Sequence, residues 1–194
     1  MPLRSEGMKT AIIVIDVIND FVSGALGSQR AAKIVPSIRR LLRRAREEEV
    51  PVVYVTDAHL PEGDREFDVW PRHAVDGSEG ARVVDALRPE AGDHHVKKRR
   101  YSGFYATGLD ALLRELGVDT VVLTGLVTNI CVQHTAADAF FRGYRVVVPR
   151  DCVEAPSDEA QGASLRYMEE MYGAEVSSSE ALMGGGLIGE GQAA

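Results

Sequence analysis

Cysteine is scarce in this sequence, with two residues in 194. Two cysteines, in a chain whose first residues lack the apolar stretch of a signal peptide, do not form the disulfide framework of a small secreted protein. No apolar run approaches the roughly 20 residues that a membrane-spanning helix needs. We therefore expect a cytoplasmic protein that keeps its thiols reduced and has no membrane partner.

Positive charge is also in the minority. Lys and Arg number 22 against 29 Asp and Glu, and the resulting net charge of −7 argues against nucleic acid as a main partner. An arginine-rich stretch at 39–46 is followed at once by glutamates, which is typical of a solvated helix face. With 45% hydrophobic residues and no repeat or low-complexity segment, the chain suits one domain over 1–194.

Apolar runs that are typical of buried strands alternate with helical patterns along the chain. The predicted strands are 10–16, 51–56, 94–98, 120–124, 144–149 and 174–176. The predicted helices are 31–49, 81–87, 109–116, 130–141 and 157–172. This order predicts an α/β fold in which two layers of helices enclose a central, mostly parallel sheet. We place the core at about 9–176 and expect 177–194, rich in Gly, Ser and Ala, to form a flexible tail or an oligomer arm.

One segment places a cysteine at the start of a predicted helix. The strand 120–124 is expected to end at Gly125, and the helix follows from about Ile130. A thiol at a helix N-terminus lies near free N–H groups and the positive end of the helix dipole, which should lower its pKa and can hold an oxyanion. Cys131 is therefore a candidate nucleophile, although free cysteine is more often a small core residue.

Two other groups with suitable chemistry follow predicted strands. Asp16 ends the first strand, and Lys97 and Lys98 end the third. Parallel strands gather their carboxyl ends at one edge of a sheet, so a carboxylate, an ammonium group and the Cys131 thiol are expected in one crevice. There the carboxylate can take the thiol proton and pass it to a leaving group. Strand alternation sends one lysine toward this site and the other away, without saying which.

A further set of side chains follows the strand 51–56. Asp57 and His59 are two residues apart, which puts them on one face of an extended segment, and His73 comes from the long loop 60–80. A carboxylate with two imidazoles suits zinc, iron or manganese with positions left open for water or ligand. A salt-bridged aspartate with two loop histidines is the alternative.

Three motifs, taken together and in order, resemble those of the isochorismatase-like cysteine hydrolase superfamily. They are Ile13-Val-Ile-Asp-Val-Ile-Asn-Asp-Phe21, Lys98-Arg-Arg-Tyr-Ser-Gly-Phe104 and Gly125-Leu-Val-Thr-Asn-Ile-Cys131. The resemblance covers nearly the whole chain and implies the three-layer fold of that superfamily. It also implies an Asp–Lys–Cys catalytic triad, which falls on Asp16, Lys98 and Cys131. The lysine motif of the superfamily thereby selects Lys98 over Lys97.

The same resemblance bears on how a substrate would be held. It implies a cis peptide between Leu126 and Val127, which aims the Val127 N–H, with that of Cys131, at an oxyanion. The Asp57, His59 and His73 set is similar to the metal triad of nicotinamidases, which bind the pyridine nitrogen to the metal. The aromatic residues that match their ring-stacking positions are Phe21 and Trp70, and we also expect Tyr101 to contact the substrate.

These features lead us to expect an amidase that converts nicotinamide and water to nicotinate and ammonia through a Cys131 thioester. It would use a divalent metal, zinc first and iron or manganese next, and form a homodimer or homotetramer. Three departures from the nicotinamidases leave the substrate open: Ala58 stands where they usually have Trp, Ala74 where they often have Cys, and the loop Leu60 to Asp68 is unlike theirs. An N-carbamoylsarcosine amidase-like or other ureido hydrolase is the second hypothesis, an isochorismatase the third, and a non-catalytic binding protein the last.

Overall fold

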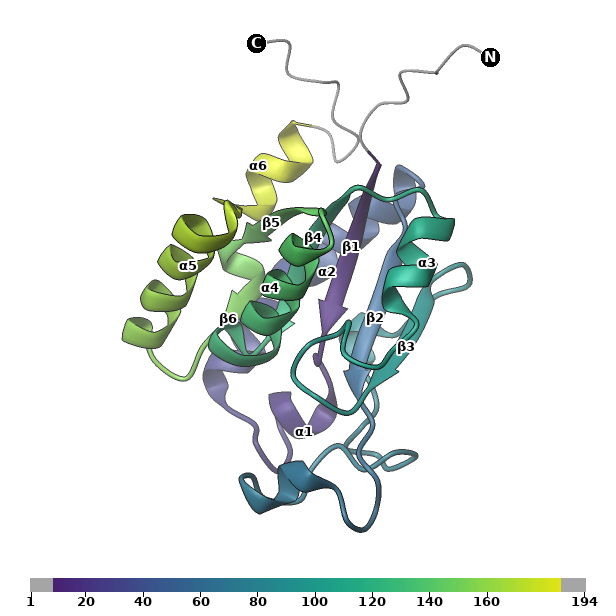
Figure 1. Cartoon of the computed structure of the whole chain (residues 1–194), viewed down its shortest axis with the longest axis vertical. Helices are drawn as coiled ribbons and strands as arrows, with labels where there is room; N and C mark the ends of the chain where they lie inside the picture. Colours follow the sequence, from purple (N-terminus) through teal and green to yellow (C-terminus); the bar gives the residue numbers. More distant parts are fainter. Residues whose placement is uncertain (1–8, 186–194) are drawn as a thin grey trace.

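The architecture comes from a computed structural model, which describes residues 9–185 (Figure 1). Its centre is a seven-stranded, wholly parallel sheet with the strand order β3-β2-β1-β4-β5-β7, and β6 pairs with the end of β4. The strands are β1 Thr10–Ile15, β2 Val52–Asp57, β3 His94–Lys98, β4 Thr120–Leu126, β5 Arg145–Pro149, β6 Val153–Glu154 and β7 Glu175–Ser177. The predicted α/β fold with a parallel sheet is therefore confirmed.

Helices cover both faces of the sheet. The α-helices are α1 Asn19–Val22, α2 Gln29–Glu47, α3 Leu109–Glu115, α4 Gln133–Phe141, α5 Asp158–Tyr172 and α6 Ser179–Gly184. In Figure 1, α2 lies behind the sheet, and α3, α4 and α5 lie in front of it. Among the helices within residues 9–185, none combines the length and apolar character needed to cross a membrane.

Strand alternation explains why β1 carries a continuous run of apolar residues from Ala11 to Ile15. In β1, Ile12 and Val14 belong to the core shared with α2, whereas Ile13 and Ile15 belong to the core shared with α3 and α4. Successive side chains of a strand point to opposite faces, and here both faces are covered. The continuous apolar run in the sequence thus follows directly from the three-layer arrangement.

The chain differs from the prediction at the end of β4. This strand was expected to end at Gly125, but it continues to Leu126. Gly125 pairs with Ile15 of β1, and it has a φ of 111°, a conformation that favours glycine. A Cβ at this position would lie 1.9 Å from the Ile15 carbonyl oxygen, so glycine permits the close approach that extends the strand. A second difference is that the helix predicted at 81–87 is only a 3₁₀ turn at Asp85–Leu87.

The C-terminal segment also differs from the prediction. Residues that we assigned to a tail form the end of β7 and then α6. The Ser178 side chain caps α6, the Ser179 N–H donates to the Asp151 carboxylate at 2.7 Å, and Leu182 and Met183 pack against the core that contains α2. The packed domain therefore extends to about residue 185, and the rest of the predicted tail lies outside the described residues.

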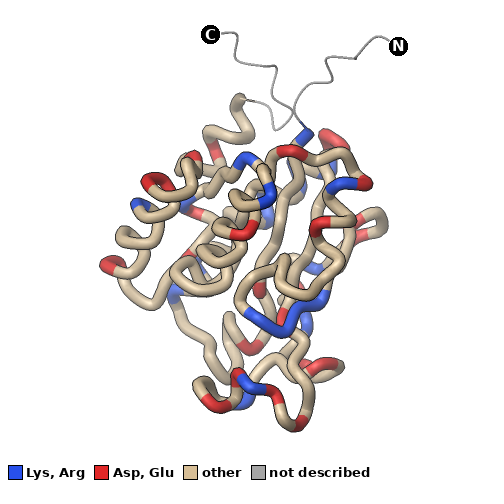
Figure 2. The backbone as a smooth tube through the Cα atoms, in the orientation of Figure 1, with Lys and Arg blue, Asp and Glu red and all other residues tan. Residues whose placement is uncertain are grey.

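Charged residues of both signs are interspersed over the helices and loops (Figure 2). The arginine-rich part of α2 illustrates this mixing, because Arg43 lies 3.9 Å from Glu47 and Arg44 pairs with Glu48. These exposed pairs are worth little stability, but they neutralise part of the basic face. The arrangement agrees with the expectation of a solvated helix face.

Candidate active site

Three predicted side chains meet at the carboxyl edge of the sheet. The Lys98 Nζ lies 2.7 Å from Asp16 Oδ2 and 3.5 Å from the Cys131 Sγ. All three side chains are buried, with exposed fractions of 0% for Asp16, 1% for Lys98 and 5% for Cys131. Lys97 points away and pairs with Asp76 at 2.6 Å. The structure thus places Lys98, rather than Lys97, beside the thiol.

Asp16 is fixed by the backbone as well as by Lys98. It follows β1 with a φ of 52°, which residues other than glycine rarely adopt. Its Oδ1 accepts the Asp57 N–H at 2.7 Å, and its Oδ2 faces Lys98. Unusual backbone conformations of this kind concentrate at functional sites, where the surrounding structure holds them in place.

The cysteine lies in an unusual turn after β4. The peptide between Leu126 and Val127 is cis, as the family resemblance implied. Residues Thr128–Val132 then form one π-helical turn that leads into α4, and such turns are frequent at functional sites. No acceptor within residues 9–185 takes the Val127 N–H, so this donor remains free at the turn that carries Cys131.

Burial dominates the electrostatics of the three groups. It raises the pKa of Asp16 to about 7, and the nearby Asp57 carboxylate adds to this effect while Lys98 opposes it. Burial also raises the pKa of the Cys131 thiol well above its ordinary value, although Lys98 acts to lower it. Our expectation of a lowered thiol pKa at this helix start is therefore wrong, because the thiol is buried and lies near two carboxylates, Asp16 and Asp57.

The predicted metal ligands also come together, with one addition. Ligand atoms of Asp57, His59, Glu66 and His73 all lie within 4.8 Å of one another, and the four residues are buried. The His59 Nε2 is 3.6 Å from Asp57 Oδ2 and 3.7 Å from Glu66 Oε2. We call these four residues the four-donor set. Carboxylate and imidazole donors in this number suit zinc, iron or manganese.

Two observations test whether the four-donor set fits a cation. The His59 Nε2 and the Glu66 Oε1 are buried and have no hydrogen-bond partner within the described part of the chain. Buried polar atoms without partners are rare in native structures, and a bound cation would satisfy them. The His73 Nδ1 lies 2.6 Å from the Pro71 carbonyl oxygen, which orients the ring and leaves its Nε2 for the set. The residues present fit a divalent cation.

Sequence reasoning missed Glu66. It lies in a 3₁₀ turn, Arg65–Asp68, whose start is capped by the Asp64 side chain. Asp64 is itself buried and lies 3.2 Å from the His59 Nδ1. The only sequence feature that could have indicated Glu66 was that acidic residues occur in the loop between His59 and His73. This loop has several acidic residues, and its path in three dimensions decides which of them points into the site.

Asp57 joins the four-donor set to the nucleophile. Its Oδ1 lies 2.6 Å from the Lys98 Nζ, whereas its Oδ2 faces His59. Burial works against the charged form of Asp57, but Lys98 and then His59 lower its pKa below the ordinary value. One oxygen of Asp57, one of Asp16 and the Cys131 sulfur lie within 4.8 Å of one another. The two groups of residues therefore form one continuous site.

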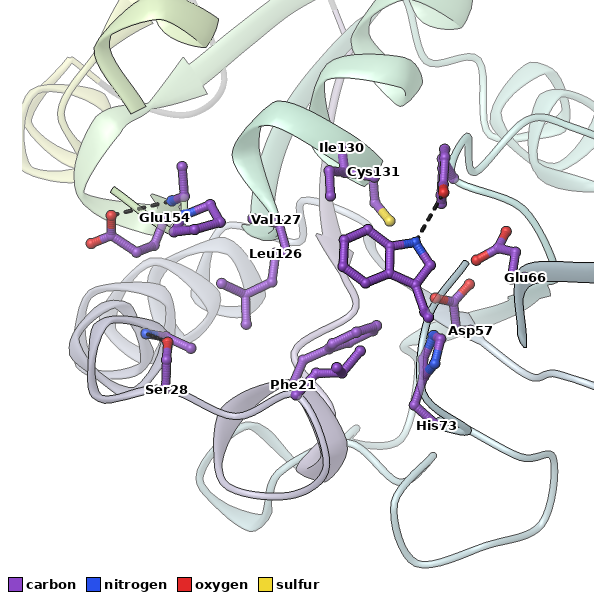
Figure 3. Close-up of a pocket in the computed structure, with 16 residues that line it drawn as sticks. Phe21, Ser28, Asp57, Glu66, His73, Leu126, Val127, Ile130, Cys131 and Glu154 are labelled. Atoms are coloured by element: carbon purple, nitrogen blue, oxygen red, sulfur yellow. Dashed lines mark hydrogen bonds between the residues drawn. The ribbon is translucent and has the colours of Figure 1, made fainter. Parts of the chain in front are cut away.

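A cavity of about 260 Å³ opens onto this site. The three predicted substrate-contacting residues, Phe21, Trp70 and Tyr101, all line it together with Cys131. The Trp70 Nε1 donates a hydrogen bond of 3.0 Å to the Tyr101 hydroxyl, which fixes one aromatic wall. In Figure 3, the Cys131 sulfur faces the pocket from above, with the carboxylates of the four-donor set and His73 at one side and Phe21 below.

Comparisons with known proteins agree with this geometry. A family model described as Isochorismatase domain matches residues 10–181. N-carbamoylsarcosine amidase from Thermoplasma acidophilum has a TM-score of 0.84 and 45% identity, over 89% of this chain and 98% of that one. PncA from Bacillus subtilis, a nicotinamidase/pyrazinamidase, has a TM-score of 0.84 and 32% identity, over 88% and 100%. A Pyrococcus horikoshii pyrazinamidase, in complex with zinc, has a TM-score of 0.81 and 34% identity, over 88% and 99%.

These matches span most of the chain and nearly the full length of each similar structure. They agree with the resemblance carried by the three sequence motifs, and they include amidases that act on different amides. The chain therefore belongs to the isochorismatase family and is an amidohydrolase, an enzyme that cleaves amide carbon–nitrogen bonds.

Proposed function

We propose that the protein hydrolyses nicotinamide, or a closely related heteroaromatic carboxamide, to the acid and ammonia. One observation carries this proposal: a single cavity is lined by the Cys131 thiol, by Phe21 and Trp70, and by three members of the four-donor set. A flat heteroaromatic amide uses all of these features. The aromatic side chains would stack on its ring, a cation held by the four-donor set would bind its ring nitrogen, and the thiol would attack its carbonyl carbon.

In the first step, Asp16 removes the proton from the Cys131 thiol as the sulfur attacks the amide carbon. The raised pKa of Asp16, about 7, suits a group that must accept this proton and later release it. The Lys98 ammonium, 3.5 Å from the sulfur, stabilises the negative charge that forms there. In this proposal, the Val127 and Cys131 N–H groups donate hydrogen bonds to the oxyanion of the tetrahedral intermediate.

In the second step, the carbon–nitrogen bond breaks as Asp16 gives its proton to the amine, which leaves as ammonia. The acyl group then remains on the Cys131 sulfur as a thioester. Asp16, again a carboxylate, takes a proton from a water molecule that attacks the thioester carbon. The acid is released, and the proton returns from Asp16 to the sulfur, so that every group regains its starting state.

The four-donor set would hold a divalent cation through Asp57, His59, Glu66 and His73. When bound, such a cation supplies a Lewis acid that attracts a ring nitrogen of the substrate. The similarity to a pyrazinamidase in complex with zinc supports zinc as the first choice, with iron and manganese as alternatives.

The test is ammonia release from nicotinamide by protein supplied in turn with zinc, iron(II) and manganese. We expect turnover that saturates with substrate and is lost on treatment with a chelator. Benzamide, which keeps the ring and the amide but lacks the ring nitrogen, is the matched control and should be the poorer substrate. Absence of turnover with every metal would remove nicotinamide as the substrate.

A second candidate is an N-carbamoyl amino acid or another ureido compound. It is favoured by the 45% identity to N-carbamoylsarcosine amidase and by the small Ala58 between the two donors Asp57 and His59. The same Cys131 chemistry would apply to the carbamoyl carbon. A panel that compares N-carbamoylsarcosine and ureidoacrylate with nicotinamide, by ammonia release, separates the two candidates.

The cytoplasmic location of the protein and its assembly as a homodimer or homotetramer stay predictions.

A further inference from the structure

Asp20 joins two segments that form walls of the site. Its Oδ2 accepts the Ala74 N–H at 2.8 Å, and its Oδ1 accepts the Ala25 N–H at 3.3 Å. Its own N–H donates to the Gly80 carbonyl at 3.0 Å. One side chain thus connects α1 and the chain that follows it to the loop that carries His73.

Two glycines leave space for this carboxylate. A Cβ on Gly80 would lie 2.1 Å from the Asp20 Oδ2, and a Cβ on Gly24 would lie 2.5 Å from its Oδ1. Both distances are far below any real contact, so the carboxylate occupies the space that two side chains would otherwise fill. The position of the Asp20 carboxylate therefore accounts for glycine at residue 80, and at residue 24 the backbone of Asp20, 2.8 Å from such a Cβ, adds to the same effect.

The groups that Asp20 connects are neighbours of site residues. Phe21, which follows it in the sequence, lines the cavity, and Ala74 follows His73. Ala74 has a φ of 44°, a strained conformation for alanine, and its N–H is the one that Asp20 accepts. The rings of Phe21 and His73 lie 5.4 Å apart. Asp20 itself is not among the residues that line the cavity.

We propose that Asp20 is a positioning residue that sets the spacing between Phe21 and His73, and thereby the cation affinity of the four-donor set and the fit of the substrate ring. This inference rests on the proposed function only for the identity of the ring. The carboxylate acts through the Ala74 backbone on one side and through α1 on the other. Mutation of a residue that hydrogen-bonds to a metal ligand commonly lowers metal affinity by about 10- to 100-fold. Asp20 would act in a similar way, through its hydrogen bond to the N–H of Ala74, the residue that follows His73.

Three variants test the inference. Asp20→Ala removes both acceptors, Asp20→Asn keeps one acceptor oxygen for the Ala74 N–H, and Gly80→Ala displaces the carboxylate from outside. We expect the zinc dissociation constant, measured by competition with a chromophoric chelator, to rise at least about tenfold in Asp20→Ala and Gly80→Ala, and less in Asp20→Asn. The double variant should be no worse than either single one, because both act on the same contact.

Two further measurements distinguish positioning from a general loss of structure. The alkylation rate of Cys131 by iodoacetamide should stay within about twofold of the wild type, because Asp16 and Lys98 are untouched. Gly108→Ala is the control, since a Cβ there meets nothing within 4 Å and the residue has a φ of −86°. It should leave the zinc affinity unchanged. KM for nicotinamide should rise in Asp20→Ala by a larger factor than kcat falls.

The inference is overturned if Asp20→Ala and Gly80→Ala bind zinc as the wild type does. It is also overturned if both lose zinc affinity and Cys131 reactivity together, because that result indicates unfolding of the site as a whole. Failure of the proposed function gives a different result: the wild type would bind zinc without hydrolysing nicotinamide, and the effect of the variants on zinc affinity would remain.

Discussion

The triad of Asp16, Lys98 and Cys131 and the four-donor set lie side by side, yet the chain builds them differently. The triad residues stand at the ends of β1 and β3 and in the turn after β4, whose positions the parallel sheet fixes. The four-donor set takes one residue from a strand end and three from the loop that follows β2. The sheet edge fixes the positions of the groups proposed to break the bond, whereas the backbone of a loop can take more conformations.

This difference separates the two parts of the proposed reaction. The sheet edge positions the proposed nucleophile and proton carrier, and the loop between β2 and β3 carries three of the four residues proposed to hold the cation. Asp57 is the exception, because one of its oxygens faces Lys98 and the other faces His59. We therefore expect substitutions in the triad to change turnover without changing zinc affinity. We expect substitutions in the four-donor set to change zinc affinity without changing the reactivity of Cys131. Asp57 is again the exception, because it belongs to both groups of contacts.

The largest effect is expected from Cys131→Ser. The hydroxyl is a much weaker nucleophile than the sulfur, so kcat for ammonia release should fall by at least about 10⁴-fold. Zinc affinity should not change, because the four-donor set is intact. Cys152→Ser is the matched control, and residual activity of Cys131→Ser near that of Cys152→Ser would contradict the assignment.

Lys98→Met should cost the most stability. The Lys98 Nζ lies 2.7 Å from Asp16 Oδ2 and 2.6 Å from Asp57 Oδ1. The substitution removes this ammonium group and leaves the two buried carboxylates without a cation between them. Breaking a buried ion pair in this way costs about 3–5 kcal/mol, which urea denaturation can measure. Lys97→Met, on the exposed neighbour, should change the free energy of unfolding by less than about 0.5 kcal/mol. If Lys98→Met and Lys97→Met lowered the free energy of unfolding equally, the ion pairs of Lys98 with Asp16 and Asp57 would not stabilise the fold.

Much of the triad could be predicted from the sequence because its positions depend on topology. Apolar runs indicated the strands, and the carboxyl ends of parallel strands share one edge, so Asp16 and Cys131 followed. The choice of Lys98 needed either the family resemblance or the structure, in which Lys98 is buried and Lys97 is exposed. The pKa of the thiol could not be predicted, since it depends on burial and on the second carboxylate of Asp57.

The parts that sequence reasoning missed depend on long-range packing. Glu66 turns inward because Asp64 caps a short turn and lies beside His59, and no periodic pattern signals this. Helix α6 was missed because the Gly-, Ser- and Ala-rich composition of the segment is typical of a tail. Its Ser178 cap is visible in the sequence, but the contacts of Leu182 and Met183 with the α2 core are not.

Glu66→Gln should produce an intermediate effect that is confined to the set. Loss of the charged donor should raise the zinc dissociation constant by at least about tenfold, while the alkylation rate of Cys131 stays unchanged. Asp68→Asn, in the same turn but exposed, is the control and should bind zinc as the wild type does. If the two variants bind zinc equally well, Glu66 is not a donor.

The smallest effect is expected from Trp70→Phe. The substitution keeps an aromatic wall but removes the hydrogen bond to the Tyr101 hydroxyl. A hydrogen bond contributes about 0.5–1.5 kcal/mol, so KM for nicotinamide should rise roughly two- to tenfold with little change in zinc affinity. Steady-state kinetics with ammonia detection measures this. An unchanged KM would mean that the hydrogen bond from the Trp70 indole N–H to Tyr101 does not help to position the aromatic side chains that line the cavity.

The most direct test of the central claim is mass spectrometry of enzyme mixed with substrate and quenched in acid during turnover. The account predicts a mass increase of one acyl group on the peptide that contains Cys131, and its absence in Cys131→Ser. An acyl group on Cys152 or another residue, or turnover without any acylated peptide, would contradict a Cys131 thioester and with it the mechanism proposed for this site.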